Sequence, residues 1–237
     1  MSGNYTAYHV HTELSLLDSA TKFEDYIAKA VELGQTAIAF TEHGNIYQWV
    51  AKKMACDKAG LKYLHGCEVY LTEKLLLTDP RTGEQNKVRD NYHTILIAKN
   101  YTGLQEMNEL ISRSNQGDHF YYKPRITFDE FLGISSNVIK ISACLASPLN
   151  RMSITHPMYE RLLKHYDYLE IQAHDHPEQV AYNRHLAEIS QKYGIPLIAG
   201  TDTHSLNKYK AECRTILQLS KHIEFADEDT FDLTYKS

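Results

Sequence analysis

Apolar residues in the first third of the chain recur at two alternating spacings. Residues 7–10 and 36–40 are short apolar runs, as expected for buried strands. Between them, residues 22–33 place apolar side chains on one helical face before Gly34. A second helix is predicted from Asn45, as its N-cap, to near Gly60. We expect its inward face to carry Ile46, Trp49, Val50 and Met54. The pattern therefore predicts two successive strand–helix units.

The same alternation continues along the rest of the chain. Further strands are predicted at residues 63–71, 94–98, 138–142, 168–172 and 196–199. Further helices are predicted at residues 104–114, 159–166, 178–193 and 208–219. About seven strands alternating with helices indicate an α/β fold with a parallel sheet or barrel. No linker divides the chain, so we expect residues 1–237 to form a single domain, with the polar residues 72–92 as a surface excursion.

Side chains that bind divalent metals stand almost always where an apolar run meets a polar loop. They are His9, His11, Asp18, His43, Glu68, His93, Cys144, Asp202 and His204. Nine ligands are too many for one ion. Imidazole, carboxylate and thiolate suit zinc, manganese or iron, and the set could hold two to three ions if a carboxylate bridges.

Barrel geometry brings such residues together, because the carboxyl ends of parallel strands meet on one face. His9 and His11 alternate on one strand, so both imidazoles face the same way, and Asp202 with His204 repeats that spacing. His93 does not fit this picture, because it stands at the start of its apolar run. Two roles remain open for Glu42, as a ligand or as an acceptor that orients an imidazole, and we favour the second. Cys67 points to the opposite strand face and is expected in the core.

Charge and cysteine content change the picture little. The formal charge of −5 is unusual for a protein that handles nucleic acid. Three bound divalent ions would add about +6 and one ionised cysteine about −1, which brings the loaded protein near neutrality. Four cysteines without a CxxC pair, and no apolar stretch near the roughly 20 residues of a membrane span, predict a cytoplasmic protein without a membrane partner.

The ligand motifs and their order resemble the polymerase and histidinol phosphatase (PHP) superfamily of metal-dependent phosphoesterases. The motifs are the His9-Val-His11 opening, Thr-Glu-His43-Gly, Gly-Cys-Glu68-Val-Tyr and Asp202-Thr-His204. More narrowly, three segments are similar to the amino-terminal PHP domains of bacterial replicative DNA polymerase III alpha subunits: Phe120-Tyr-Tyr-Lys-Pro-Arg125, Ile141-Ser-Ala-Cys144-Leu and Leu169-Glu-Ile-Gln172. The resemblance implies a distorted (β/α)7 barrel. The sequence of this chain departs from the family pattern at Glu42, where Asp is usual, and at Ala143 and Ala146, where glycine is usual.

The resemblance also divides the ligands among three ions. One ion would take His9, His11, Glu68 and Asp202; a second would share Glu68 and take His93 and Cys144; a third would take Asp18, His43 and His204. Such a cluster supplies a nucleophile at neutral pH and relieves charge on the phosphoryl oxygens. Glu68, Asp202 and His11 would then act in catalysis through the metals, and the sequence offers no separate base.

Three functions remain open. The first is a 3′–5′ exonuclease that proofreads a single-stranded or mismatched DNA 3′ end, beside replication proteins or a polymerase region. Lys123 and Arg125 could contact such a terminus, or their segment could be a packed loop; His174, paired with His176, could line the entrance or lie in a solvated loop. The second is a small-molecule phosphatase of the histidinol phosphate type. The third is a noncatalytic structural module of a polymerase. No polymerase aspartates follow before Ser237, so we expect no polymerisation by this chain, whether it is free-standing or part of a polymerase.

Overall fold

Seven extended segments follow one another around a closed ring in the computed structural model of the chain, which describes residues 5–222 and 231–236. The ring consists, in spatial order, of residues 7–10, β1 (Ala37–Phe40), β2 (Lys62–Thr72), β5 (Tyr92–Ala98), β8 (Val138–Ile141), β9 (Leu169–Gln172) and β10 (Leu197–Gly200). Two short strands, β6 (Phe120–Tyr121) and β7 (Lys123–Thr127), extend the sheet beyond β2.

Isolated bridges close this ring where the regular ladders end. Ala39 donates its amide to the Ala7 carbonyl at 2.9 Å, which joins residues 7–10 to β1. His11 donates to the Thr203 carbonyl at 2.8 Å, which joins the same segment to the chain just after β10. On the far side, Ser142 donates to the Tyr168 carbonyl at 3.2 Å and so connects the ends of β8 and β9.

An apolar cluster fills the inside of the ring. Six of the seven ring segments contribute to it, and Tyr168 directly precedes the remaining one, β9, as expected for a barrel interior. Its members are Tyr8, Ala39, Leu64, Ile95, Ile97, Ile139, Ile141, Ala143, Tyr168 and Ile198. The outward faces of the strands pack in larger clusters under the helices, and Cys67 lies there, as the sequence predicted.

Strand β5 runs against its neighbours, which is the main difference from the expected parallel arrangement. It pairs antiparallel with both β2 and β8, and His93 stands opposite Tyr70 near the end of β2. The beginning of β5 therefore lies at the same rim as the carboxyl ends of the other strands. This reversal explains why His93 begins its apolar run and still reaches that rim.

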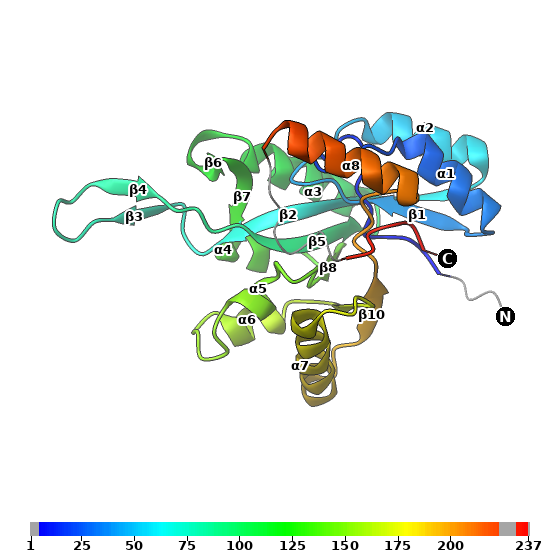
Figure 1. The fold of residues 1–237 in the computed structure, drawn as a ribbon. Helices are drawn as coiled ribbons and strands as arrows, with labels where there is room; N and C mark the ends of the chain where they lie inside the picture. Colours follow the sequence, from blue (N-terminus) through cyan, green and yellow to red (C-terminus); the bar gives the residue numbers. More distant parts are fainter. Residues whose placement is uncertain (1–4, 223–230, 237) are drawn as a thin grey trace.

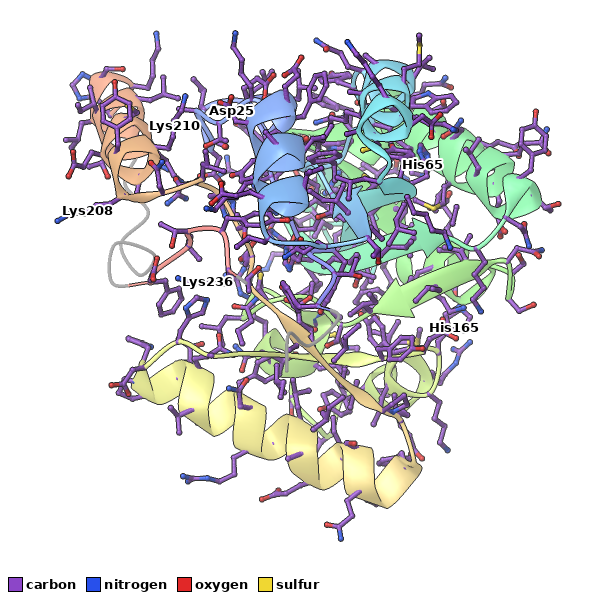
Figure 2. The ribbon with its side chains drawn as sticks, turned by 90° about the vertical axis from the view of Figure 1, so that its right-hand side faces the viewer. Asp25, His65, His165, Lys208, Lys210 and Lys236 are labelled. Carbon is purple, nitrogen blue, oxygen red and sulfur yellow. The ribbon has the colours of Figure 1, made fainter. Side chains whose placement is uncertain are left out.

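Helices cover the ring from several sides (Figure 1). On one side lie α1 (Phe23–Glu32), α2 (Trp49–Ala59) and α8 (Lys208–Ser220); on the opposite side lie α5 (Pro148–Arg151), α6 (Tyr159–Leu163) and α7 (Pro177–Tyr193). The remaining helices are α3 (Tyr101–Ser114), α4 (Phe128–Leu132) and the short 3-10 helix η1 (Gly117–His119). Lys210 of α8 faces Asp25 of α1, with Nζ 4.0 Å from the carboxylate (Figure 2).

Helix α2 turns a different face inward from the one that its apolar residues predict. Val50 is 51% exposed and Met54 is 66% exposed, whereas Lys52 and Cys56 are buried. The helix also begins later than expected, with Gln48 rather than Asn45 in the capping position. Lys52 lies on the inward face instead and pairs there with Glu42.

Residues 72–92 project from the barrel as a two-stranded hairpin of β3 (Leu76–Thr78) and β4 (Gln85–Lys87), at the left of Figure 1. Most of its side chains are exposed, which agrees with a surface excursion. Within the described part of the chain, no helix is both long and apolar enough to cross a membrane.

Candidate metal centre

All nine predicted ligands meet at one rim of the barrel. They come from segments far apart in sequence: residues 7–18, the loop after β1, β2, β5, the loop after β8, and the loop after β10. The candidate ligand atoms form three groups, and inside each group the atoms lie within 4.8 Å of one another. The groups are His11 with His43 and His204; His9 with His11 and Asp202; and Glu68 with His93 and Cys144.

Glu68 is the central carboxylate of this cluster. Its Oε2 lies 2.7 Å from His43 Nδ1, and its Oε1 lies 3.0 Å from His93 Nδ1 and 3.5 Å from His9 Nε2. Cys144 Sγ approaches His93 Nδ1 to 3.7 Å. A carboxylate whose two oxygens face different histidines has the arrangement needed to bridge two ions.

Asp202 joins the histidines at the two ends of the chain. Its Oδ1 lies 3.0 Å from His9 Nε2, 3.3 Å from His11 Nε2 and 3.6 Å from His204 Nδ1. Asp202 has a φ of +46°, a left-handed conformation that non-glycine residues rarely adopt. Strain of this kind is held only where surrounding contacts enforce it, and it gathers at functional sites.

Asp18 uses its two oxygens for different purposes. Oδ2 lies 2.9 Å from His43 Nε2 and 3.1 Å from His204 Nε2, inside the cluster. Oδ1 accepts hydrogen bonds from Arg214 at 2.5 Å and from Gln218 at 3.0 Å, both on α8. Helix α8 therefore fixes one oxygen and leaves the other directed at the histidines.

Several buried polar atoms at the centre make no hydrogen bond with any described residue. They are Nε2 of His9, His11 and His204, and Oδ1 of Asp202. Although some of these atoms lie about 3 Å apart, they do not meet with hydrogen-bond geometry. Buried polar atoms normally have partners, so convergent atoms without them fit ligands directed at common cations. The donor set of imidazole, carboxylate and thiol accords with divalent transition metals.

Contacts outside the cluster orient three imidazoles with Nε2 inward. His9 Nδ1 lies 2.8 Å from the Glu170 carboxylate, and His204 Nδ1 lies 2.8 Å from the Asp202 carbonyl. Both acceptors require a proton on Nδ1, so the Nε2 lone pair is free to bind a cation once the imidazole is neutral. His11 Nδ1 lies 3.0 Å from Ser15 Oγ.

The electrostatics follow from crowding histidines and carboxylates in a buried site. Burial by itself lowers the pKa of His43, but hydrogen bonds to Asp18 and Glu68 raise it to about 10. Burial and the neighbouring imidazoles of His43 and His204 lower the pKa of His11 to about 3. Burial opposes ionisation of Glu68, yet His93, His43 and His9 hold the pKa of this carboxylate well below its usual range. Without metal, the site is thus a network of charged partners.

Sequence reasoning missed the residues that support the ligands. Glu170 also accepts hydrogen bonds from Tyr8 and Gln172, and a Cβ on Gly200 would lie 2.3 Å from its Cδ, so glycine leaves room for it. A lone carboxylate in the apolar segment Leu-Glu-Ile-Gln was the available signal. Glu42 contacts no imidazole directly; it reaches His11 only through Ser15.

The three residues expected to contact substrate differ in their exposure and in their contacts. Lys123 is exposed and lines the cleft over the metal centre, where its Nζ lies 3.1 Å from Tyr70 Oη. Arg125 is fully buried and donates to backbone carbonyls of Val88, Asp118 and His119, so its expected contact with DNA is wrong; it holds loops together. His174 stacks on Phe231, a residue of the cleft wall, with ring centroids 4.7 Å apart.

The cleft has a volume of about 770 Å³ and opens to solvent at the rim. Its walls include the ligands Asp18, His43, Glu68, His93, Cys144, Asp202 and His204. Large exposed side chains also line it, namely Leu16, Leu17, Tyr47, Phe120 and Tyr122. Exposed aromatic side chains beside a buried metal centre indicate a binding surface for a ligand larger than phosphate.

Comparisons with known sequences agree on the family to which this chain is similar. The family described as "PHP domain" matches residues 7–176. The DNA polymerase III subunit alpha of Aquifex aeolicus is 33% identical over 98% of this chain, and that of Borreliella burgdorferi is 33% identical over 88%. The chain spans only about a fifth of the length of these curated relatives: 21% and 19%.

Solved structures share the fold at low sequence identity. A protein from Bifidobacterium adolescentis named as a candidate metal-dependent phosphoesterase has a TM-score of 0.59 and 12% identity, over 84% of this chain and 87% of that one. A two-domain protein from Bacteroides vulgatus, containing a predicted PHP-like metal-dependent phosphoesterase, has a TM-score of 0.52 and 13% identity, over 84% of this chain and 51% of that one.

Proposed function

The chain belongs to the PHP domain family, and from this membership we propose that it is a metal-dependent phosphoesterase that removes nucleotides from the 3′ end of DNA. Its similarity to polymerase III alpha subunits supports a replication context, with a polymerase region or other replication proteins as partners. The observation that carries the proposal is the convergence of nine ligands beneath an open cleft lined by exposed aromatic side chains.

The nine residues fit two to three divalent ions. Glu68, with His93 and Cys144, would hold one; His9, His11 and Asp202 would hold another, sharing Glu68; Asp18, His43 and His204 would hold a third. When bound, such ions supply an activated water and neutralise charge on the phosphate. Glu68, Asp202 and His11 contribute to catalysis by holding and orienting the ions. No side chain of the described cleft is required as a separate base.

The rim of the cleft supports a single-stranded polynucleotide as substrate. Tyr122 is 70% exposed, and the Arg89 guanidinium lies 5.0 Å from its ring centroid. Tyr47 and Phe120 are about half exposed on the same cleft. Aromatic side chains stack on unpaired bases, and nearby Lys and Arg pair with the phosphates between them. Lys123 lines the same cleft and would contact a phosphate of the bound strand.

A phosphatase for small molecules of the histidinol phosphate type needs the same metals but a closed pocket. The exposed aromatic rim speaks against that alternative. A noncatalytic structural role would not require a metal-binding residue at all nine ligand positions, and this chain has one at each of them.

The test is hydrolysis of 3′-mismatched DNA by the purified chain with manganese, compared with Asp202→Ala and with a chelator control. We expect stepwise loss of 3′ nucleotides that disappears in both controls. Tyr122→Ala should weaken binding of single-stranded DNA by about tenfold and leave manganese binding unchanged, because stacking contributes about 1–3 kcal/mol per base.

Other outcomes would redirect the proposal. Cleavage of histidinol phosphate alone would assign a small-molecule phosphatase. Metal binding without hydrolysis of either substrate would assign a structural module. Activity that survives in Asp202→Ala would contradict the metal mechanism.

A further inference from the structure

Helix α2 buries a lysine where it could have buried apolar side chains. Lys52 is only 2% exposed, while Val50 and Met54 on the same helix face solvent. Removing an ammonium from water costs several kcal/mol even when it is paired. Positions where a chain departs from its own apolar pattern are often functional sites. A buried ammonium also requires a partner of opposite charge.

That partner is Glu42, directly before a predicted metal ligand. Lys52 Nζ lies 2.6 Å from Glu42 Oε1, and both side chains are shielded from solvent. Thr12 donates its amide to Glu42 Oε2 at 3.0 Å and its hydroxyl to Oε1 at 2.5 Å. Ser15 donates its hydroxyl to Oε2 at 2.5 Å. Four donors thus surround this carboxylate and fix its orientation.

The Ser15 hydroxyl links the Glu42 carboxylate to His11 of the metal centre. It has one proton, which goes to Glu42, so it can only accept from its other neighbours. Those neighbours are the His43 amide at 3.2 Å and His11 Nδ1 at 3.0 Å. His11 must therefore carry its proton on Nδ1. Its Nε2 is left bare and faces Asp202 and Glu68.

We propose that Lys52 and Glu42 are positioning residues for the metal centre, which act through Ser15 to hold His11 with Nε2 directed at the ions. Lys52 orients Glu42, Glu42 accepts the hydrogen bond of the Ser15 hydroxyl, and Ser15 in turn accepts a hydrogen bond from His11. Groups that hold a metal-binding imidazole from behind commonly change metal affinity by 10–100-fold when removed. This role is independent of which phosphoester the chain hydrolyses.

The decisive variant is Ser15→Ala, because it cuts the link to His11 and leaves the Lys52–Glu42 pair intact. We expect manganese binding, measured by chelator competition on the full chain, to weaken about 10- to 100-fold. Lys52→Met should weaken it in the same direction. Lys53→Met is the matched control, because Lys53 is the next residue of α2, is exposed and pairs only with Asp57 among the described residues; its manganese affinity should equal that of the unaltered chain.

Nitrogen NMR of the metal-free histidines gives an independent readout. The His11 ring should show a proton on Nδ1 in the unaltered chain and lose this preference in Ser15→Ala. Unaltered manganese affinity in Ser15→Ala, or an equal loss in Lys53→Met, would overturn the proposal. If Lys52→Met fails to fold, the Ser15→Ala result still decides.

Discussion

At the scale of single residues, the metal centre is built from side chains whose ordinary charge states have been reset by their neighbours. His43 lies between Asp18 and Glu68, and these carboxylates outweigh burial in raising its pKa to about 10. Burial raises the pKa of the Cys144 thiol well above its usual range, with Asp202 and Glu68 acting in the same direction. The metal-free centre therefore holds protons that bound cations must displace.

Metal binding at neutral pH should release protons, and its affinity should rise with pH as His43 approaches its pKa of about 10. Calorimetry in two buffers of different ionisation enthalpy measures this release. His43→Asn should lower the number of released protons by about one. A binding enthalpy that does not depend on the buffer would contradict this assignment. In the metal-free chain, the raised pKa stabilises the fold fully below about 6.5, and that contribution is lost as pH rises through about 10.

The convergence of the candidate ligands was predictable from single residues, because paired spacing on strands and positions at strand ends are visible in the sequence. His9 with His11, and Asp202 with His204, converge as their spacing indicated. Glu170 offered one weak local signal, a lone carboxylate in an apolar segment. Its role depends on facing His9 across the ring, and no local pattern reports that contact.

At the scale of elements, the direction and the inward face of each element decide which side chains reach the centre. Strand β5 runs antiparallel to both neighbours, which brings His93 to the ligand rim from the start of its strand. Helix α8 reaches the centre from outside the ring, because Arg214 and Gln218 are four residues apart and both contact Asp18. Neither the reversal of β5 nor the docking of α8 has a signature in local periodicity.

Replacing Arg214 with Met should lower the free energy of unfolding of the metal-free chain by about 3 kcal/mol, because it leaves a buried Asp18 oxygen without its cation. Urea unfolding followed by circular dichroism measures the loss. The deficit should shrink when manganese is added, since a bound cation compensates the same carboxylate. Lys208→Met, on the exposed start of α8, is the control and should be neutral; an equal loss there would assign the effect to the helix rather than to Asp18.

At the scale of the whole molecule, one bridge joins residues 7–10, the first extended segment of the described chain, to the loop after β10 and so closes the barrel. Candidate ligands from both ends of the described chain thus lie on one ring. The β3–β4 hairpin stands outside this ring, and its strands pair only with each other.

Replacing residues 76–87 with Asn-Gly should leave the fold and manganese binding intact. The Val88 amide already donates to the Leu75 carbonyl at 3.1 Å, so a two-residue turn can join them. The thermal unfolding midpoint and the manganese affinity should both stay close to those of the unaltered chain. A large loss of either would mean that the hairpin supports the barrel. Weaker binding of single-stranded DNA alone would instead assign the hairpin to the substrate surface.

The sequence by itself determined the strand–helix alternation, the seven segments of the ring and the nine candidate ligands, because burial periodicity and strand-end chemistry are local properties. Tertiary structure alone decided the reversal of β5, the inward face of α2, the burial of Arg125 and the support of His9 by Glu170. Each of these depends on contacts between residues distant in sequence. Lys52 is the clearest case: it is buried against Glu42, while Val50 and Met54 of the same helix face solvent.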